Sequence, residues 1–202
     1  MIALIELGRL TLDMTAFTGA LGLLLIMPGP TNTVLAVAGS ERGFVRGVPL
    51  IFMVVFGYLT TVLVLLAFAA PLLHAHPALA KAVAVAAAVW VLTLAVRMWR
   101  SGAQGKGGDE FSALALYTTT VLNPKGLVIG LALLPEGTIT QIAPYLAAMV
   151  IVVSAVSLIW LSLGATAIRS LSLRHPVLVS RGAAGSLAVF AAALAGRAAG
   201  WV

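Results

Sequence analysis

The sequence contains no cysteine and few charged residues. Of its 202 residues 9% are charged, whereas soluble domains usually carry roughly 25%. Without cysteine the chain forms no disulfide and has neither a thiolate nucleophile nor a thiolate metal ligand. The shortage of charge argues against a soluble globular protein.

Apolar residues dominate instead, at 61% of the chain, and the mean hydropathy is +1.12. The 20 glycines and 9 prolines lie mainly within apolar runs, which is typical of transmembrane helices. A net charge of +6 would by itself fit a nucleic-acid binder. The basic residues are spread over short loops, however, which indicates membrane topology instead. The composition predicts an integral membrane protein in contact with lipids and without a nucleic-acid partner.

Six runs are long enough to cross a membrane, which takes about 20 mostly apolar residues for about 30 Å of hydrocarbon. A secretory signal peptide is an alternative for the first run, because "AVA" at 36–38 resembles a cleavage site. That run is too long for a signal peptide, and prolines interrupt it. The six runs are 15–38, 47–70, 78–96, 111–134, 142–168 and 183–202.

Lysine and arginine predict the orientation of these runs, since cytoplasmic loops are enriched in both. The loops on one side carry eight basic residues and those on the other side carry three. The larger set is placed in the cytoplasm, with both termini outside. The larger set is Arg42, Arg46, Arg97, Arg100, Lys106, Arg169, Arg174 and Arg181, and the smaller is Arg9, Lys81 and Arg197.

A single linker divides the chain into two halves. Residues 101–110, "SGAQGKGGDE", are rich in glycine and charge and separate a first half, 1–100, from a second half, 111–202. Each half has three runs, and because three is odd the halves cross the membrane in opposite directions. We therefore predict an all-α membrane protein of six transmembrane helices arranged as two inverted three-helix repeats.

The first run of each half carries helix breakers. "MPGPTN" at 27–32 and "VLNPKGL" at 121–127 lie within apolar sequence at similar depth, within several ångströms of the predicted midplane. A lone proline in such a helix is often only a kink. Paired breaks at matching positions are, however, the best sequence indication of a transporter's binding site.

Each break also predicts the start of a new helix. Proline lacks an amide hydrogen and disrupts a helix interior, but it is favoured at the first helical position after glycine or asparagine. We expect half-helices to begin at Pro30 and Pro124, with Pro28 and Gly29 as an unwound joint. Their N-termini, with unpaired amides, would both face the centre and favour an anion.

Polar residues beside the breaks supply candidate ligands for a small molecule. Lys125 adds a positive charge for a carboxylate and should face a cavity or a partner. Freed backbone carbonyls could accept from an ammonium group, so a zwitterionic amino acid fits. Polar side chains farther away, among them Tyr58, Thr61 and Thr120, are further candidates to line a cavity, although Ser and Thr in membrane helices more often bond to their own helix or a neighbour. The predicted substrate-binding residues are Pro28, Gly29, Pro30, Thr31, Asn32, Asn123, Pro124 and Lys125.

Both motifs resemble one known family. "MPGPTNTVLAVAGSERGFVRGV" at 27–48 resembles the first helix and basic loop of the LysE/RhtB family of bacterial amino-acid exporters. "TTTVLNPKGLVIGLALLPE" at 118–136 resembles the family's fourth segment. The resemblance, which covers nearly the whole chain, implies export of amino acids or close relatives across the bacterial inner membrane. It also implies drive by the proton gradient and no cofactor.

Proton coupling needs a group that titrates, and the sequence leaves three candidates open. Asp13 and Glu136 lie at span ends toward the outer side, and Lys125 lies at depth. The oligomeric state is equally open. Gly182 and Gly185 near the sixth run permit close helix contact, so a homodimer is one of the allowed assemblies.

Other functions fit the residues less well. The first alternative is an exporter of another small solute or of a metal cation. Metal export needs carboxylate, imidazole or thiolate ligands, and none is predicted at depth. An intramembrane enzyme would need catalytic residues within the membrane. His74, His76 and His175 are all placed in loops, so no Ser–His pair is predicted at depth, and no HExxH zinc site occurs. A non-transporting membrane scaffold, in which the breaks are mere kinks, is the third alternative.

Overall fold

The computed structural model describes residues 13–69, 77–104, 112–135 and 137–199, and every regular element within these ranges is a helix. Each of the six predicted runs is mainly helical over its described residues, and the first and fourth are interrupted at their prolines. The elements are α2 (Met14–Ile26), α3 (Pro30–Arg42), α4 (Phe44–Gly47), α5 (Leu50–Val64), the π-helical η1 (Leu65–Ala69), α7 (Pro77–Gln104), α8 (Ala113–Val121), α9 (Pro124–Val128), the π-helical η3 (Ile129–Leu133), α10 (Ile139–Leu163), the π-helical η4 (Gly164–Ile168), α11 (Arg169–Arg174) and α12 (Pro176–Ala199).

Length and composition allow two of the described helical stretches to cross a membrane. These are Phe44–Ala67 and Ile139–Leu171. A third is added if Met14–Ile26 and Pro30–Arg42, which are bent by 62° at their junction, form one broken span. The helical class of the fold is thus confirmed, whereas six crossings in two inverted repeats remain a prediction.

Several predicted boundaries differ from the structure, two of them beside the predicted linker and at the sixth run. Helix α7 continues to Gln104, so residues 101–104 of the predicted linker are helical, and 105–110 lie outside the described residues. Helix α12 begins at Pro176, seven residues before the predicted start of the sixth run. Proline is favoured at the first helical position, and this local preference outweighs the weaker apolar character of the first turns.

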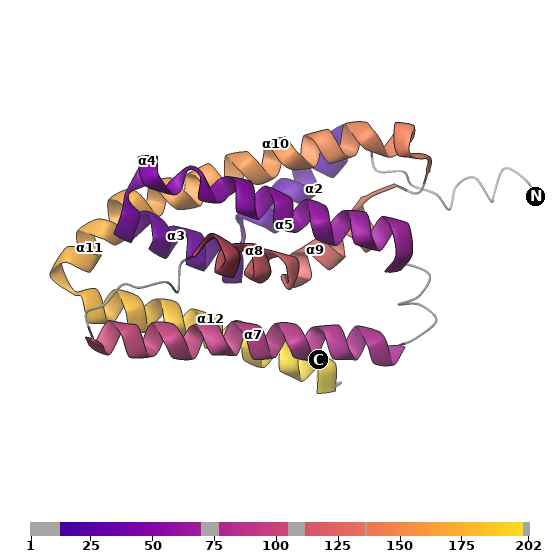
Figure 1. Ribbon diagram of the computed structural model, residues 1–202. Coiled ribbons are helices and arrows are strands. Elements are labelled where there is room, and N and C mark those ends of the chain that lie inside the picture. The colour runs from indigo at the N-terminus through magenta and orange to yellow at the C-terminus, as the bar shows by residue number, and fades with distance from the viewer. Residues whose placement is uncertain (1–12, 70–76, 105–111, 136, 200–202) are drawn as a thin grey trace, which may run out of the picture.

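The long helices lie roughly parallel to one another (Figure 1). Helices α3, α8 and α9 lie between a layer that contains α5 and α10 and a pair formed by α7 and α12. Helix α3 packs on α10, and α8 packs on α5. The broken helices therefore occupy the middle of the molecule, where other helices surround them.

Close packing holds each half-helix beyond a break against a π-helical segment. Ala36, six residues after Pro30, lies very close to Gly164 of η4. A Cβ added to Gly164 would overlap the Ala36 carbonyl. Six residues after Pro124, Gly130 packs on Leu65 of η1, whose Cδ1 would lie 2.7 Å from a Cβ at Gly130. In each half, the residue six positions after the proline thus packs on a π-helical segment.

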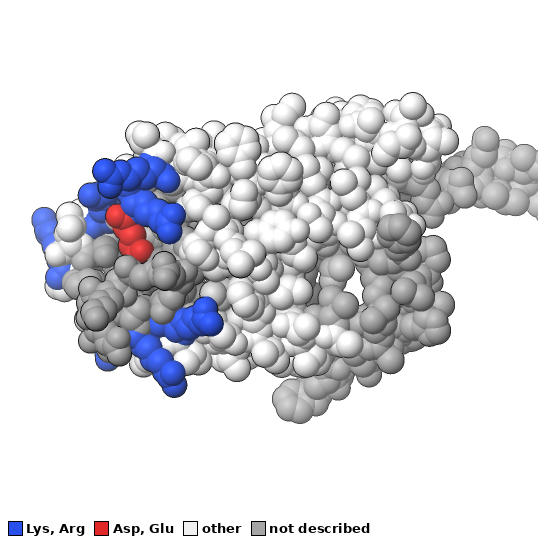
Figure 2. Space-filling model, viewed as in Figure 1, with Lys and Arg blue, Asp and Glu red and all other residues white. Residues whose placement is uncertain are grey.

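Described arginines gather at one end of the molecule (Figure 2). This end contains the α3–α4 junction with Arg42 and Arg46, and α11 with Arg169 and Arg174. A further contact there places the guanidinium of Arg181 5.1 Å from the ring centre of Trp99. The described residues of the predicted cytoplasmic set therefore lie at the same end of the molecule. Arg9 and Lys106, and the side chains of Lys81 and Arg197, lie outside the described residues.

Candidate functional site

The first break follows the prediction from "MPGPTN". Helix α2 ends at Ile26, and α3 begins at Pro30 after Gly29, which is extended and has no side chain to cap the helix. The break leaves two backbone carbonyls available to side chains. Asn32 Nδ2 donates to Leu25 O at 2.8 Å and to Met27 O at 2.9 Å. A side chain of the new half-helix thus satisfies the end of the old one.

The second break also begins a helix at its proline. Helix α8 ends at Val121 and α9 begins at Pro124, where Asn123 Oδ1 accepts from the backbone N–H of Lys125 at 3.0 Å. The hydroxyl of Thr61 on α5 donates to Val121 O at 3.1 Å. This break therefore has an N-cap of its own and a donor for its freed carbonyl.

Buried polar side chains join the two breaks. Asn123 Nδ2 donates to Thr31 Oγ1 at 2.8 Å, and the Thr31 and Thr120 hydroxyls are 3.3 Å apart. The hydroxyl of Tyr58 lies 3.4 Å from Asn123 Nδ2. Exposure is 8% for Asn32 and 2% or less for Thr31, Thr120, Asn123 and Tyr58. Residues 65 to 92 positions apart in the sequence thus form one hydrogen-bonded cluster.

Lys125 forms the second connection between the breaks. Its Nζ donates to Leu25 O at 3.3 Å and to Met27 O, the same two carbonyls that bind Asn32. Gly29 makes room for this side chain, because a Cβ there would lie 3.2 Å from Lys125 Cε. The charge predicted for a carboxylate therefore rests on backbone carbonyls of the opposite half.

This junction lies partly at the surface. Lys125 is half-buried, and Met27, whose carbonyl accepts from it, is 57% exposed. Pro28 is exposed as well, whereas Gly29 and Pro30 are buried. The Met27 side of the junction is therefore exposed, while the Thr31–Asn123 cluster is enclosed.

Asp13, another proton-coupling candidate, does not lie at the breaks. Asp13 is exposed and caps α2, where its Oδ1 accepts from Ala16 N at 2.7 Å. Since α2 ends at Ile26, the whole helix separates this carboxylate from the first break. Glu136 lies outside the described residues. Of the three candidates, Lys125 alone is placed at the junction by the described contacts.

Sequence reasoning gave Tyr58, Thr61 and Thr120 less weight than the motif residues. Thr61 and Thr120 do bond to their own helices, donating to Gly57 O and Leu116 O. Each also contacts a break, as described above. The signal for all three is the same: a polar side chain in an otherwise apolar run.

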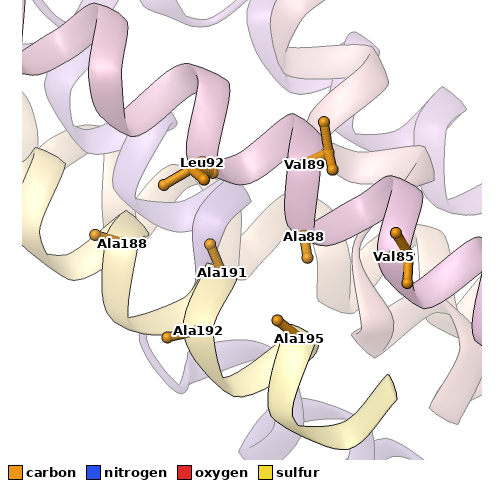
Figure 3. A pocket seen from close by; sticks show the side chains of 8 residues that line it. All are labelled: Val85, Ala88, Val89, Leu92, Ala188, Ala191, Ala192 and Ala195. Carbon is orange, nitrogen blue, oxygen red and sulfur yellow. The ribbon is translucent and has the colours of Figure 1, made fainter. Parts of the chain in front are cut away.

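A separate pocket lies between α7 and α12 (Figure 3). Its volume is about 490 Å³, and only apolar side chains line it. They come from residues 85–92 of α7 and 188–195 of α12, which are the third and sixth predicted runs. The sequence does not predict this pocket, and none of its lining residues belongs to the breaks.

The junction of the breaks brings together an ammonium donor, side-chain amides and hydroxyls, and a pair of carbonyl acceptors, which bond to one another. No family model, curated protein or solved structure matches the chain. The resemblance of 27–48 and 118–136 to the LysE/RhtB family therefore stays a prediction.

Proposed function

We propose that the protein is a secondary transporter that exports amino acids or closely related small zwitterions across the bacterial inner membrane. The two three-helix halves would move relative to each other about the contacting breaks, exposing the site to each side in turn. The proton gradient would drive export, as the family resemblance implies.

One observation carries this proposal: side chains of each half bond directly to the break of the other half. Lys125 of the second half binds the Leu25 and Met27 carbonyls of the first, and Thr31 of the first binds Asn123 of the second. Discontinuous helices that meet at a repeat interface are where transporters bind substrates. A carboxylate suits Lys125, and an ammonium group suits the carbonyl pair.

The exposed side of the first break supports an aqueous path to this site. Backbone that is not helical is tolerated at membrane depth only where protein buries it or where it lines a water-filled cavity. Met27 and Pro28 are exposed, so at membrane depth they would need water or another protein surface beside them. A substrate route meets that requirement.

Helix pairing supports the inverted repeat. The first run packs on the fifth through α2, α3 and α10, and the fourth packs on the second through α8, α9 and α5. The third and sixth runs pack on each other as α7 and α12. Exchanging the two halves leaves this set of pairings unchanged, and the matching Ala36–Gly164 and Gly130–Leu65 contacts obey the same exchange.

The grouped arginines support the proposed orientation. Basic residues at one end of a helical membrane protein mark its cytoplasmic side, which here is the end that holds α11 (Figure 2). Helix α3 runs toward that end, and α9 with η3 runs away from it (Figure 1). Both half-helices would then start at mid-depth and end at opposite membrane surfaces.

Efflux from loaded vesicles tests the proposal. Vesicles with the wild-type protein are loaded with each of the twenty amino acids, and release is followed with and without a pH gradient. We expect gradient-dependent release of at least one amino acid and its loss in Lys125→Ala and Asn32→Ala. Ser154→Ala is the matched control, because Ser154 donates only to Val150 O of its own helix in the described contacts.

Two results would contradict the proposal. Release of no amino acid by protein that is folded and correctly inserted would refute the transport function. Normal release by both variants at equal membrane abundance would refute the site and favour the scaffold alternative. Asp13 lies away from the breaks. Measuring gradient-dependent efflux by an Asp13→Asn variant therefore distinguishes a role of Asp13 in proton coupling from a role of Lys125.

A further inference from the structure

Two acceptors at the first break already hold an ammonium group. Lys125 Nζ donates to Leu25 O and to Met27 O. In the transport mechanism proposed above, these freed carbonyls are the acceptors for the substrate's own amino group. The protein's lysine and the substrate's ammonium therefore require the same two atoms.

We propose that the Lys125 ammonium is an internal stand-in for the substrate's amino group, so that the site without substrate is self-occupied. This inference rests on the proposed transport function. Substrate binding is then an exchange of ammonium groups. The incoming ammonium takes the carbonyls of Leu25 and Met27, and the released Lys125 side chain pairs with the substrate's carboxylate.

Charge balance favours a zwitterion in this exchange. Before and after it, one ammonium rests on the carbonyl pair, and the displaced lysine gains a carboxylate partner. A simple amine would add a second positive charge beside Lys125 and give it no partner, and like charges in a partly desolvated site repel. The exchange therefore selects substrates that carry both groups.

The surroundings allow the lysine side chain to move while the backbone stays in place. The N–H of Lys125 is held by Asn123 Oδ1 at 3.0 Å, which anchors the start of α9. Gly29 leaves space beside Lys125 Cε. Asn32 keeps its bonds to both carbonyls when the lysine leaves, so the acceptor pair remains oriented for the incoming group.

Replacing the missing atoms with a small amine tests the self-occupied site directly. Lys125→Ala removes three methylenes and the ammonium, which n-propylammonium supplies as a separate molecule. In purified full-length protein, n-propylammonium chloride should raise the Tm of Lys125→Ala saturably, by about 2 to 4 °C. It should leave the wild-type Tm unchanged. Tetramethylammonium chloride, which cannot donate a hydrogen bond, controls for ionic strength.

A second variant covers the case in which Lys125→Ala fails to fold. Lys125→Met keeps a side chain of similar length and lacks little more than the ammonium itself, so ammonium chloride is its probe. For an amino acid that is exported, the matched decarboxylated amine should bind the wild type at least about tenfold more weakly.

The outcomes separate this inference from the transport proposal. A rise in Tm in the variants alone supports the self-occupied site, even if vesicles release no amino acid and the transport function fails. Equal effects on wild type and variants, or none on either folded variant, overturn the self-occupied site while measured efflux would still stand. A wild type that binds the amine as tightly as its amino acid overturns the exchange.

Discussion

The two helix breaks solve the same problem in different ways. At the second break, the freed backbone groups find partners within the break and on α5. Asn123 caps α9, and Thr61 of α5 donates to Val121 O. The first break has glycine at the cap position and is bent by 62°. Its carbonyls depend on Asn32 and on Lys125 of the other half.

This difference assigns distinct roles to the two breaks. The first presents acceptors that a side chain from elsewhere fills, and a ligand can compete for such acceptors. The second break, which Asn123 caps, positions Lys125 so that its ammonium group reaches these acceptors. In the proposed transporter, one break that supplies acceptors and one that supplies a donor would recognise the two ends of a zwitterion separately, which two identical breaks could not do.

The largest predicted contrast concerns how each half-helix beyond its break is packed. A Cβ at Gly164 meets the Ala36 backbone, whereas a Cβ at Gly130 meets the end of the flexible Leu65 side chain. Gly164→Ala should lower the free energy of unfolding by about 3 kcal/mol and Gly130→Ala by about 1 kcal/mol or less. Denaturation in detergent measures both, and equal losses would contradict the packing difference.

We expect an intermediate loss of stability when either of the two asparagines is replaced by alanine. Asn123→Ala removes a cap and leaves the Thr31 hydroxyl without its amide donor, so we expect a loss of about 1 to 3 kcal/mol in unfolding free energy. Asn32→Ala should cost a similar amount, because Leu25 O and Met27 O each lose a donor.

Substitution by serine distinguishes the roles of Asn123 and Asn32. Serine caps helices about as well as asparagine, so Asn123→Ser should recover part of the stability. Asn32→Ser should recover none, because its shorter side chain cannot reach carbonyls that lie in the preceding helix end. Equal recovery at both positions would show that the breaks are stabilised alike.

The smallest effect is expected at the carbonyl of the second break. Thr61→Val removes the donor to Val121 O and should lower the unfolding free energy by about 1 kcal/mol. Thr93→Val is the control, because Thr93 donates to Val89 O of its own helix. A loss at Thr61 no larger than that at Thr93 would mean that this carbonyl needs no cross-helix donor.

Local rules account for what the sequence predicts well. Apolar runs mark the helices, and Pro30 and Pro124 mark new helix starts because proline disrupts a helix interior but is favoured at the first helical position. The spacing of basic residues predicts the arginine end of the molecule. These features depend on residues that are close together in the chain.

The partners within the site depend on tertiary packing and were not predictable. The sequence indicates that carbonyls are freed near Pro28, but not that Asn32 and Lys125 bind the same pair. Nor does it indicate that Tyr58 reaches Asn123. The Lys125 and Tyr58 contacts join residues far apart in the chain, where hydrophobic periodicity carries no information about register.

Cross-linking across the two breaks tests most directly that they form one moving site. The chain has no cysteine, so Thr31→Cys with Thr120→Cys introduces the only thiol pair. The hydroxyl oxygens that the sulfurs replace are 3.3 Å apart, and a small shift brings sulfur atoms to the bonded 2.05 Å. We predict that oxidation in membranes forms the bond, stops amino-acid efflux, and is reversed by a reductant. Failure of the pair to cross-link, or full efflux by the cross-linked protein, would contradict the account.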